Sequence, residues 1–147
     1  MGADEEGKNP IVGTWKILTF SRHDVATGSD CDMWGEHPTG HIAFTAGGHV
    51  VVWLVGDRRQ ARAEVRTDAE RLARFKDIIS GYSGTYTVER NKLVMHVETA
   101  WVPDWCGTDQ TRYFSREGSK LVVKTAPFKS PLDGREVVNT LVFERVE

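Results

Sequence analysis

Four polar residues in the second half of the chain could carry chemistry: His96, Glu98, Gln110 and Arg112. A histidine with a carboxylate partner can move a proton, and an arginine with an amide can stabilise an oxyanion. The set therefore predicts cofactor-free acid–base catalysis, such as isomerisation, cyclisation, dehydration or a retro-aldol step. In this prediction His96 is the proton shuttle, Glu98 its partner, and Arg112 with Gln110 the oxyanion cradle.

Other kinds of active site are not indicated by the sequence. His37 and His41 have a spacing seen in metal sites, but the proline and glycine between them prevent a helix from presenting both on one face. The chain has no phosphate-binding loop, dinucleotide fingerprint or G-x-S-x-G elbow. Cys31 and Cys106 lie in loop-like sequence and are expected to be free thiols. We therefore expect no metal ion and no cofactor.

The length and the charge of the chain limit its architecture and its partners. A chain of 147 residues can form one domain with one core. A formal net charge of −2, with basic residues scattered among acidic ones, argues against a nucleic-acid or membrane partner. The acidic N-terminus lacks the layout of a signal peptide. We expect a cytoplasmic protein with a flexible tail over residues 1–10 and one domain over residues 11–147. Its oligomeric state is not fixed by the sequence, and a homodimer is one option.

Turn signals recur at the spacing expected of β-hairpins. Gly47-Gly48, Arg90-Asn91 and Glu117-Gly118 each separate stretches rich in β-branched and aromatic residues. Further strands are expected at residues 15–20 and 137–145. About eight strands at this spacing predict an all-β fold, a single closed antiparallel barrel.

One segment interrupts the β pattern. Residues 67–70 form a capping box, in which Thr67 is the N-cap and Glu70 reaches back. Apolar residues then follow at helical spacing and Gly81 ends the pattern: Leu72, Phe75, Ile78 and Ile79. One amphipathic helix cannot cover a whole sheet, so we expect it at one end of the barrel, as a lid or plug.

Two sets of residues resemble known families. Gly13-Thr14-Trp15 with Arg145 on the last strand resembles the lipocalin superfamily, in which this tryptophan packs at the closed end beneath a late arginine. Barrel closure makes the first and last strands neighbours, so the two side chains can stack. Residues 81–88, 94–98 and 103–112 resemble the bacterial and fungal lipocalin-like domain family. The resemblance implies a barrel that encloses a small molecule, and some members are associated with small-molecule biosynthesis or catabolism.

Hairpin register predicts which residues face the interior, because directly opposed residues share a face. In the hairpin that turns at Glu117-Gly118, the charged side chain of Lys124 on the second strand should face the solvent. The residues of the first strand that lie opposite the other, apolar face of the second strand should then point inward: Gln110, Arg112 and Phe114.

The preceding hairpin gives two answers. It pairs Tyr86 with Met95 on an apolar interior face, which directs His96 and Glu98 outward. The following loop, however, would set Glu98 opposite Arg112 and draw it inside. A bulge or a one-residue register change would reconcile the two, and both orientations stay open.

An arginine inside a barrel is costly to desolvate unless an anion receives it. Arg112 therefore either pairs with Glu98 or Asp109 and stiffens the barrel, or holds a carboxylate, enolate or phenolate of a ligand. Trp53, expected to pair with Ile42, is expected to line the core or the pocket. The loop residue Trp105 either suits a planar hydrophobic ligand at the barrel mouth or anchors its loop against the rim. The residues expected to contact this ligand are Gln110, Trp53, Tyr86, Met95, Trp105, Phe114 and Asn139.

Two function classes follow. The favoured one is a cofactor-independent isomerase, cyclase or lyase acting on a carbonyl-bearing aromatic or polyketide-like compound. The alternative is a binding or carrier protein whose polar groups only orient the ligand. The orientation of His96 separates them, because a histidine in solvent cannot serve a reaction inside the barrel.

Overall fold

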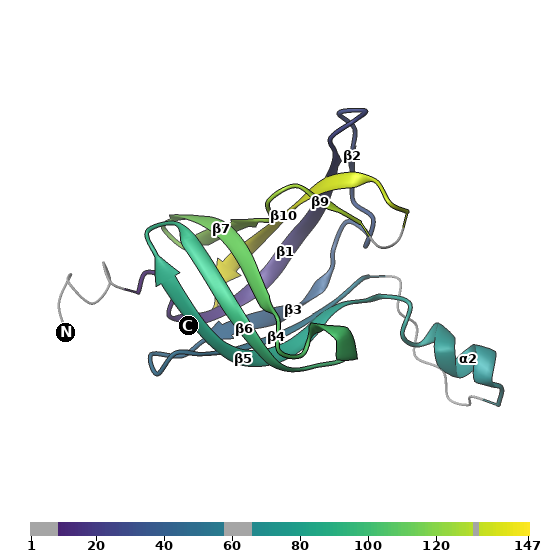
Figure 1. The fold of residues 1–147 in the computed structure, drawn as a ribbon, viewed down its shortest axis with the longest axis horizontal. Helices are drawn as coiled ribbons and strands as arrows, with labels where there is room; N and C mark the ends of the chain where they lie inside the picture. Colours follow the sequence, from purple (N-terminus) through teal and green to yellow (C-terminus); the bar gives the residue numbers. More distant parts are fainter. Residues whose placement is uncertain (1–8, 58–65, 131–132) are drawn as a thin grey trace.

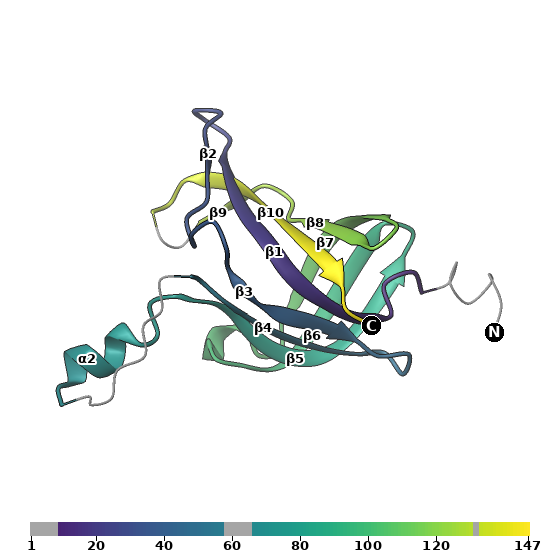
Figure 2. The same cartoon turned by 180° about the vertical axis from the view of Figure 1, so that it is seen from behind.

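The computed structural model describes residues 9–57, 66–130 and 133–147, and within these ranges eight long strands close into one antiparallel barrel (Figures 1 and 2). They are β1 (Gly13–Asp24), β3 (Thr39–Phe44), β4 (His49–Val55), β5 (Ile78–Glu89), β6 (Lys92–Ala100), β7 (Asp109–Glu117), β8 (Lys120–Lys124) and β10 (Glu136–Arg145). Each pairs with the next of these along the chain, and pairing of β1 with β10 closes the ring. The two-residue strand β2 (Asp30–Cys31) pairs with the end of β1, and the two-residue strand β9 (Phe128–Lys129) pairs with the start of β10. The predicted all-β barrel is confirmed.

The hairpin turns explain which predicted registers hold. Tyr86 pairs with Met95 as expected, around a turn whose Arg90 has a φ of 57°. The β7–β8 turn lies one residue later than expected, so Phe114 faces Val123. This moves the pairing by two residues, and an even shift leaves every side chain on its predicted face.

The β3–β4 hairpin differs by a single residue. Phe44 pairs with Val50, which places Trp53 opposite His41 instead of Ile42. A one-residue change moves a whole strand to the other face. Trp53 is therefore 47% exposed, on the outside of the barrel.

The helix is shorter than predicted and does not cover the open end of the barrel. Helix α2 (Asp68–Ala73) begins at Thr67, whose hydroxyl accepts a hydrogen bond from the Glu70 backbone amide at 3.2 Å. Ile78 begins strand β5, because it pairs with Val55 of β4 in the sheet. The helix lies at the open end of the barrel but projects away from it (Figures 1 and 2), so the expected lid is absent from the described residues.

The closed end is built around Trp15, which is fully buried and donates its indole N–H to the Ile11 carbonyl at 2.9 Å. The predicted stacking with Arg145 is present, with 5.9 Å from the guanidinium carbon to the ring centre. Arg116 also lies over the ring, at 5.4 Å, and donates to the Pro10 carbonyl. Pro10 is thus tied to the barrel, and residues 1–8 of the expected tail lie outside the described residues.

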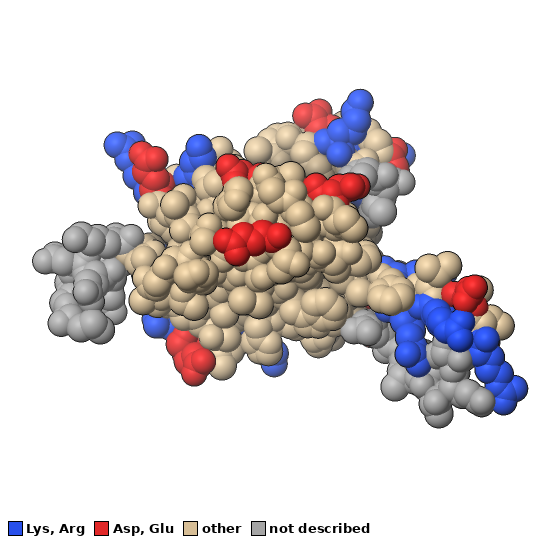
Figure 3. Space-filling model, turned by 60° about the horizontal axis from the view of Figure 1, so that its bottom comes forward, with Lys and Arg blue, Asp and Glu red and all other residues tan. Residues whose placement is uncertain are grey.

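The charged surface is less evenly mixed than the sequence suggests. Figure 3 shows lysine and arginine side chains gathered on the projecting arm that carries α2, where Arg66, Arg71, Arg74 and Lys76 lie close in sequence. The acidic residues Asp68 and Glu70 lie on the same arm, in the first turn of α2.

Among the described residues, no helix is long and apolar enough to cross a membrane.

Candidate ligand-binding site

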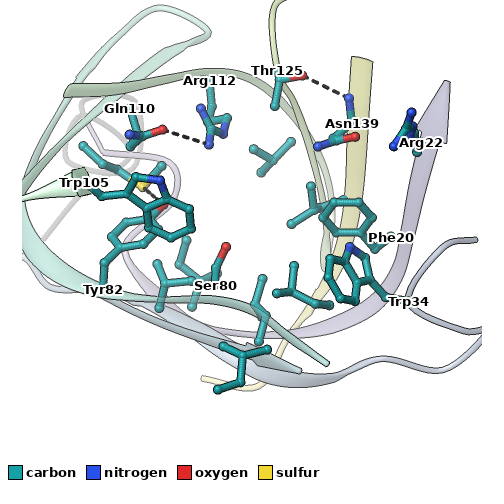
Figure 4. Close-up of a pocket in the computed structure, with 18 of the residues that line it drawn as sticks. Phe20, Arg22, Trp34, Ser80, Tyr82, Trp105, Gln110, Arg112, Thr125 and Asn139 are labelled. Atoms are coloured by element: carbon teal, nitrogen blue, oxygen red, sulfur yellow. Dashed lines mark hydrogen bonds between the residues drawn. The ribbon is translucent and has the colours of Figure 1, made fainter. Parts of the chain in front are cut away.

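A cavity of about 520 Å³ occupies the open half of the barrel (Figure 4). Its deep wall consists of inward side chains of the strands, whose alternation follows from the pleat of each strand. Its mouth is framed by three segments between strands, which contribute Trp34, Phe75 and Trp105. Trp105, in the 3-10 helix η1 (Pro103–Trp105), lies edge-on to Tyr82 with 6.1 Å between ring centres.

Arg112 is a charged group on the wall of the cavity. Its guanidinium donates to the Thr111 carbonyl at 2.8 Å and to the Gln110 Oε1 at 3.4 Å. Gln110 in turn donates to the Thr108 hydroxyl at 3.1 Å, so a short chain of hydrogen bonds orients both side chains. Burial lowers the pKa of Arg112, and it raises the pKa of the Tyr82 phenol, which therefore stays neutral at pH 7.

No carboxylate among the described residues forms an ion pair with Arg112. Asp109 instead contacts the His96 Nδ1 at 2.8 Å on the outer face. Glu98 is exposed. The predicted alternative in which Arg112 pairs with Glu98 or Asp109 is therefore wrong for this structure.

The inward orientation of His96 and Glu98 is also wrong. Met95 and Val97 face the interior, because their register is fixed by the hairpin with β5. His96 lies between them, so its side chain points outward and is 53% exposed. The expected bulge exists at Glu98, which has no partner in the ladder, but it leaves this carboxylate outside. The two residues predicted to move a proton are absent from the cavity.

The residues expected to contact a ligand divide into two groups. Those that line the cavity are Gln110, Met95, Trp105, Asn139 and Arg112. Those that do not are Trp53, Tyr86 and Phe114.

Tyr86 and Phe114 face the interior as predicted, but below the cavity. Tyr86 donates its hydroxyl to the Thr45 carbonyl at 2.7 Å and packs edge-on against Phe44 near the closed end. Trp53 lies outside, over Gly81, where an added Cβ would approach the indole ring to 2.9 Å. Strand alternation predicts the face of a side chain but not its depth along the barrel.

Arg22 and Thr125 line the cavity and were not among the expected residues. The Arg22 side chain is 11% exposed and forms a salt bridge with Asp133. The first strand was expected to end at Phe20, whereas β1 continues to Asp24. Inward positions recur every second residue, so Phe20, Arg22 and Asp24 were the signal that would have identified Arg22.

Comparison with protein-family models agrees with the fold. A family model described as a lipocalin-like domain matches residues 12–146. No curated protein matches the chain. Among solved structures, the fluorescent protein UnaG is similar at 20% identity and a TM-score of 0.41, over 94% of this chain and 98% of that one. An Asn-to-Gln mutant of UnaG is similar at 18% identity and a TM-score of 0.40, over 94% of this chain and 97% of that one.

Proposed function

The chain belongs to the family of lipocalin-like domains, and on this premise we propose that it binds a small, largely apolar molecule through an anionic oxygen. Arg112 receives the anion and Gln110 holds the guanidinium in place. The observation that carries the proposal is the partly buried guanidinium on the cavity wall, without a carboxylate partner among the described residues.

The energetic argument concerns desolvation. Removing a charged side chain from water costs on the order of several kcal/mol, unless an opposite charge and hydrogen bonds compensate for the lost hydration. The Thr111 carbonyl and the Gln110 amide supply dipoles but no charge. A ligand carboxylate, enolate or phenolate supplies the missing charge and can accept two parallel N–H bonds.

The remainder of the ligand is expected to be apolar and flat. Trp34, Tyr82 and Trp105 contribute aromatic rings to the cavity wall. Aromatic side chains pack well against planar rings, either edge-on or offset. A carbonyl-bearing aromatic or polyketide-like acid has both features.

We propose binding in place of isomerase, cyclase or lyase activity. None of the described residues that line the cavity is a histidine, an aspartate or a glutamate. Of the other side chains that commonly transfer protons, Lys76 and Tyr82 line the cavity, and burial raises the pKa of the Tyr82 phenol, so it stays protonated and cannot act as a base near neutral pH. The proton shuttle expected of His96 and Glu98 has no geometric support, because both lie on the outer face.

Calorimetric titration of para-phenylbenzoate and its methyl ester tests the proposal, because esterification removes the charge at one end and adds only a methyl group. The wild-type protein is expected to prefer the acid. Arg112→Met keeps the apolar stem but removes the charge, and should weaken acid binding roughly 10- to 100-fold, the value of a hydrogen bond to a charged group. Ester binding should not change.

The control variant is Lys124→Met, which removes one positive charge from an exposed position on neighbouring β8. It should bind the acid as the wild type does. Equal acid affinity in the wild type and in Arg112→Met would contradict the proposed function.

A further inference from the structure

The hydrogen bonds that hold Arg112 extend beyond Thr108, the residue that directly precedes strand β7. Thr108 donates its hydroxyl to the Trp105 carbonyl at 2.6 Å and accepts from the Gln110 Nε2 at 3.1 Å. The Gln110 Oε1 accepts from Arg112, a bond that Figure 4 shows on the cavity wall. An unbroken series of hydrogen bonds therefore runs from the guanidinium to the backbone of the loop at the mouth. We call it the Thr108 network.

The direction of every bond in the Thr108 network is fixed by its end at Trp105. A carbonyl oxygen can only accept, so the Thr108 hydroxyl commits its single hydrogen there and can only accept from Gln110. A side-chain amide donates through its nitrogen and accepts through its oxygen, so Gln110 turns its nitrogen to Thr108 and its oxygen to Arg112. A backbone carbonyl of the mouth loop thus decides which atom of Gln110 faces the guanidinium.

The backbone holds Thr108 in this position. Its amide donates to the Trp105 carbonyl at 3.1 Å, and its own carbonyl accepts from the Val97 amide of β6 at 2.9 Å. The neighbouring Gly107 donates to the Val97 carbonyl at 2.8 Å and has a φ of 80°, a conformation that favours glycine. Thr108 is half-buried and is not among the residues that line the cavity. Its side chain can therefore affect a ligand only through the residues that it orients.

We propose that Thr108 is a positioning residue of the binding site, which sets the preference for an acid over its ester by orienting Gln110 and, through it, Arg112. The inference rests on the proposed function and assigns a role to a residue outside the cavity wall. Without the Thr108 hydroxyl, the Gln110 nitrogen loses its acceptor and the amide is free to turn that nitrogen towards Arg112, where two donors would meet. Of its two bonds within the described residues, the guanidinium then keeps the one to the Thr111 carbonyl. A less restrained side chain loses more conformational freedom when it binds an anion, so the affinity falls.

Thr108→Val tests this role, because valine keeps the shape of threonine and lacks the hydroxyl. Calorimetric affinity for para-phenylbenzoate should fall roughly fivefold, the value of one ordinary hydrogen bond, and affinity for the methyl ester should not change. Thr108→Ser keeps the hydroxyl and should retain the wild-type preference for the acid. A role confined to the folding of the mouth loop would instead weaken both compounds equally, because they share the apolar part that the loop contacts.

The double variant tests whether Thr108 acts through Gln110. Gln110→Leu removes the intervening amide, so adding Thr108→Val to it should cause no further loss of acid affinity. Thr99→Val makes the same chemical change at an exposed position of β6, outside the Thr108 network, and should bind both compounds as the wild type does. If Thr108→Val does not fold, Gln110→Leu breaks the network from the other side and should show the same fall in the preference for the acid.

Three results overturn this inference and leave the proposed function intact. The first is an unchanged acid affinity in Thr108→Val, or an equal weakening of acid and ester. The second is a loss of the preference in Thr108→Ser, and the third is a further loss of acid affinity in the double variant. A wild-type protein that does not prefer the acid to the ester counts against the proposed function itself.

Discussion

Arg112 and Arg116 project from the same face of strand β7, four residues apart, into two different environments. Arg116 lies over the Trp15 ring and donates to the carbonyls of Pro10 and Gly118. Arg112 lines the cavity, where no described carboxylate meets it. One strand therefore supplies one arginine to the closed end and another to the wall of the cavity.

This difference predicts opposite effects on stability for the same substitution. Arg112→Met removes a desolvated charge, so the free energy of unfolding should stay constant or rise. Arg116→Met loses the stacking and two hydrogen bonds and should destabilise the protein by about 1–3 kcal/mol. Urea unfolding of the two variants measures both values. A large loss of stability in Arg112→Met would mean that the protein itself supplies the anion.

Replacing Trp15 should reduce stability without altering the site. Its side chain is fully buried at the closed end, so Trp15→Ala opens a cavity and should cost about 3–5 kcal/mol. Binding of para-phenylbenzoate, measured well below the melting temperature, should be preserved. Wild-type stability combined with lost binding would contradict the assignment of the two barrel ends.

Two tryptophans provide a matched pair for ligand contact. Trp105 lines the cavity beside Tyr82, whereas Trp53 is outside. Trp105→Ala should weaken para-phenylbenzoate binding roughly tenfold, the value of a lost aromatic contact and its buried area. Trp53→Ala should leave calorimetric affinity unchanged. The reverse result would place the ligand on the outer surface.

His96 should have no influence on the pH dependence of binding. It contacts Asp109 on the outer face, at 53% exposure, and exposed ion pairs contribute little. Titrations of para-phenylbenzoate between pH 5 and pH 8 should therefore coincide for the wild type and His96→Gln. A pH-dependent step that disappears in the variant would restore His96 to the site.

Acid sensitivity should depend on Asp24. A hydrogen bond from Arg135 at 2.8 Å, with further bonds from the amides of Thr27 and Ala26, lowers the pKa of this carboxyl. A lowered folded-state pKa stabilises the protein above the unfolded value, about 3.9, and this contribution is lost as pH falls through the folded value.

Asp24→Asn should thus be less stable than the wild type at pH 7, and the difference should shrink below about pH 4, where the carboxyl of the unfolded state becomes protonated. Urea unfolding at several pH values checks this. Asp104→Asn, at an exposed position, serves as the control. A difference that stays constant from neutral to acid pH would contradict the role of the Asp24 charge.

The sequence by itself determined the barrel, its closure at Trp15 and Arg145, and the inward face of Gln110 and Arg112. The barrel and the inward face depend on turn residues and on a period of two, which are local properties of the chain, whereas the pairing of Trp15 with Arg145 was implied by the resemblance to the lipocalin superfamily. A shift of two residues in the β7–β8 pairing did not change the inward face, because only odd shifts exchange the faces.

The tertiary structure alone decided the positions of Trp53, His96 and Glu98. A single residue in the β3–β4 turn moved Trp53 outside, and the bulge at Glu98 left that carboxylate in solvent. Shifts of one residue are decided when a strand pairs with both of its neighbours at once. A single segment of the sequence carries no information about that double pairing.

Depth and alignment across strands were likewise decided by the tertiary structure. Tyr86 and Phe114 face inward but lie below the cavity, because alternation carries no information on distance along the barrel axis. The alignment of Arg22 with Asn139 requires β1 to pair with β10, two strands from opposite ends of the chain. This alignment exists because closing the ring fixes the stagger of every strand, and that stagger is a property of the whole barrel.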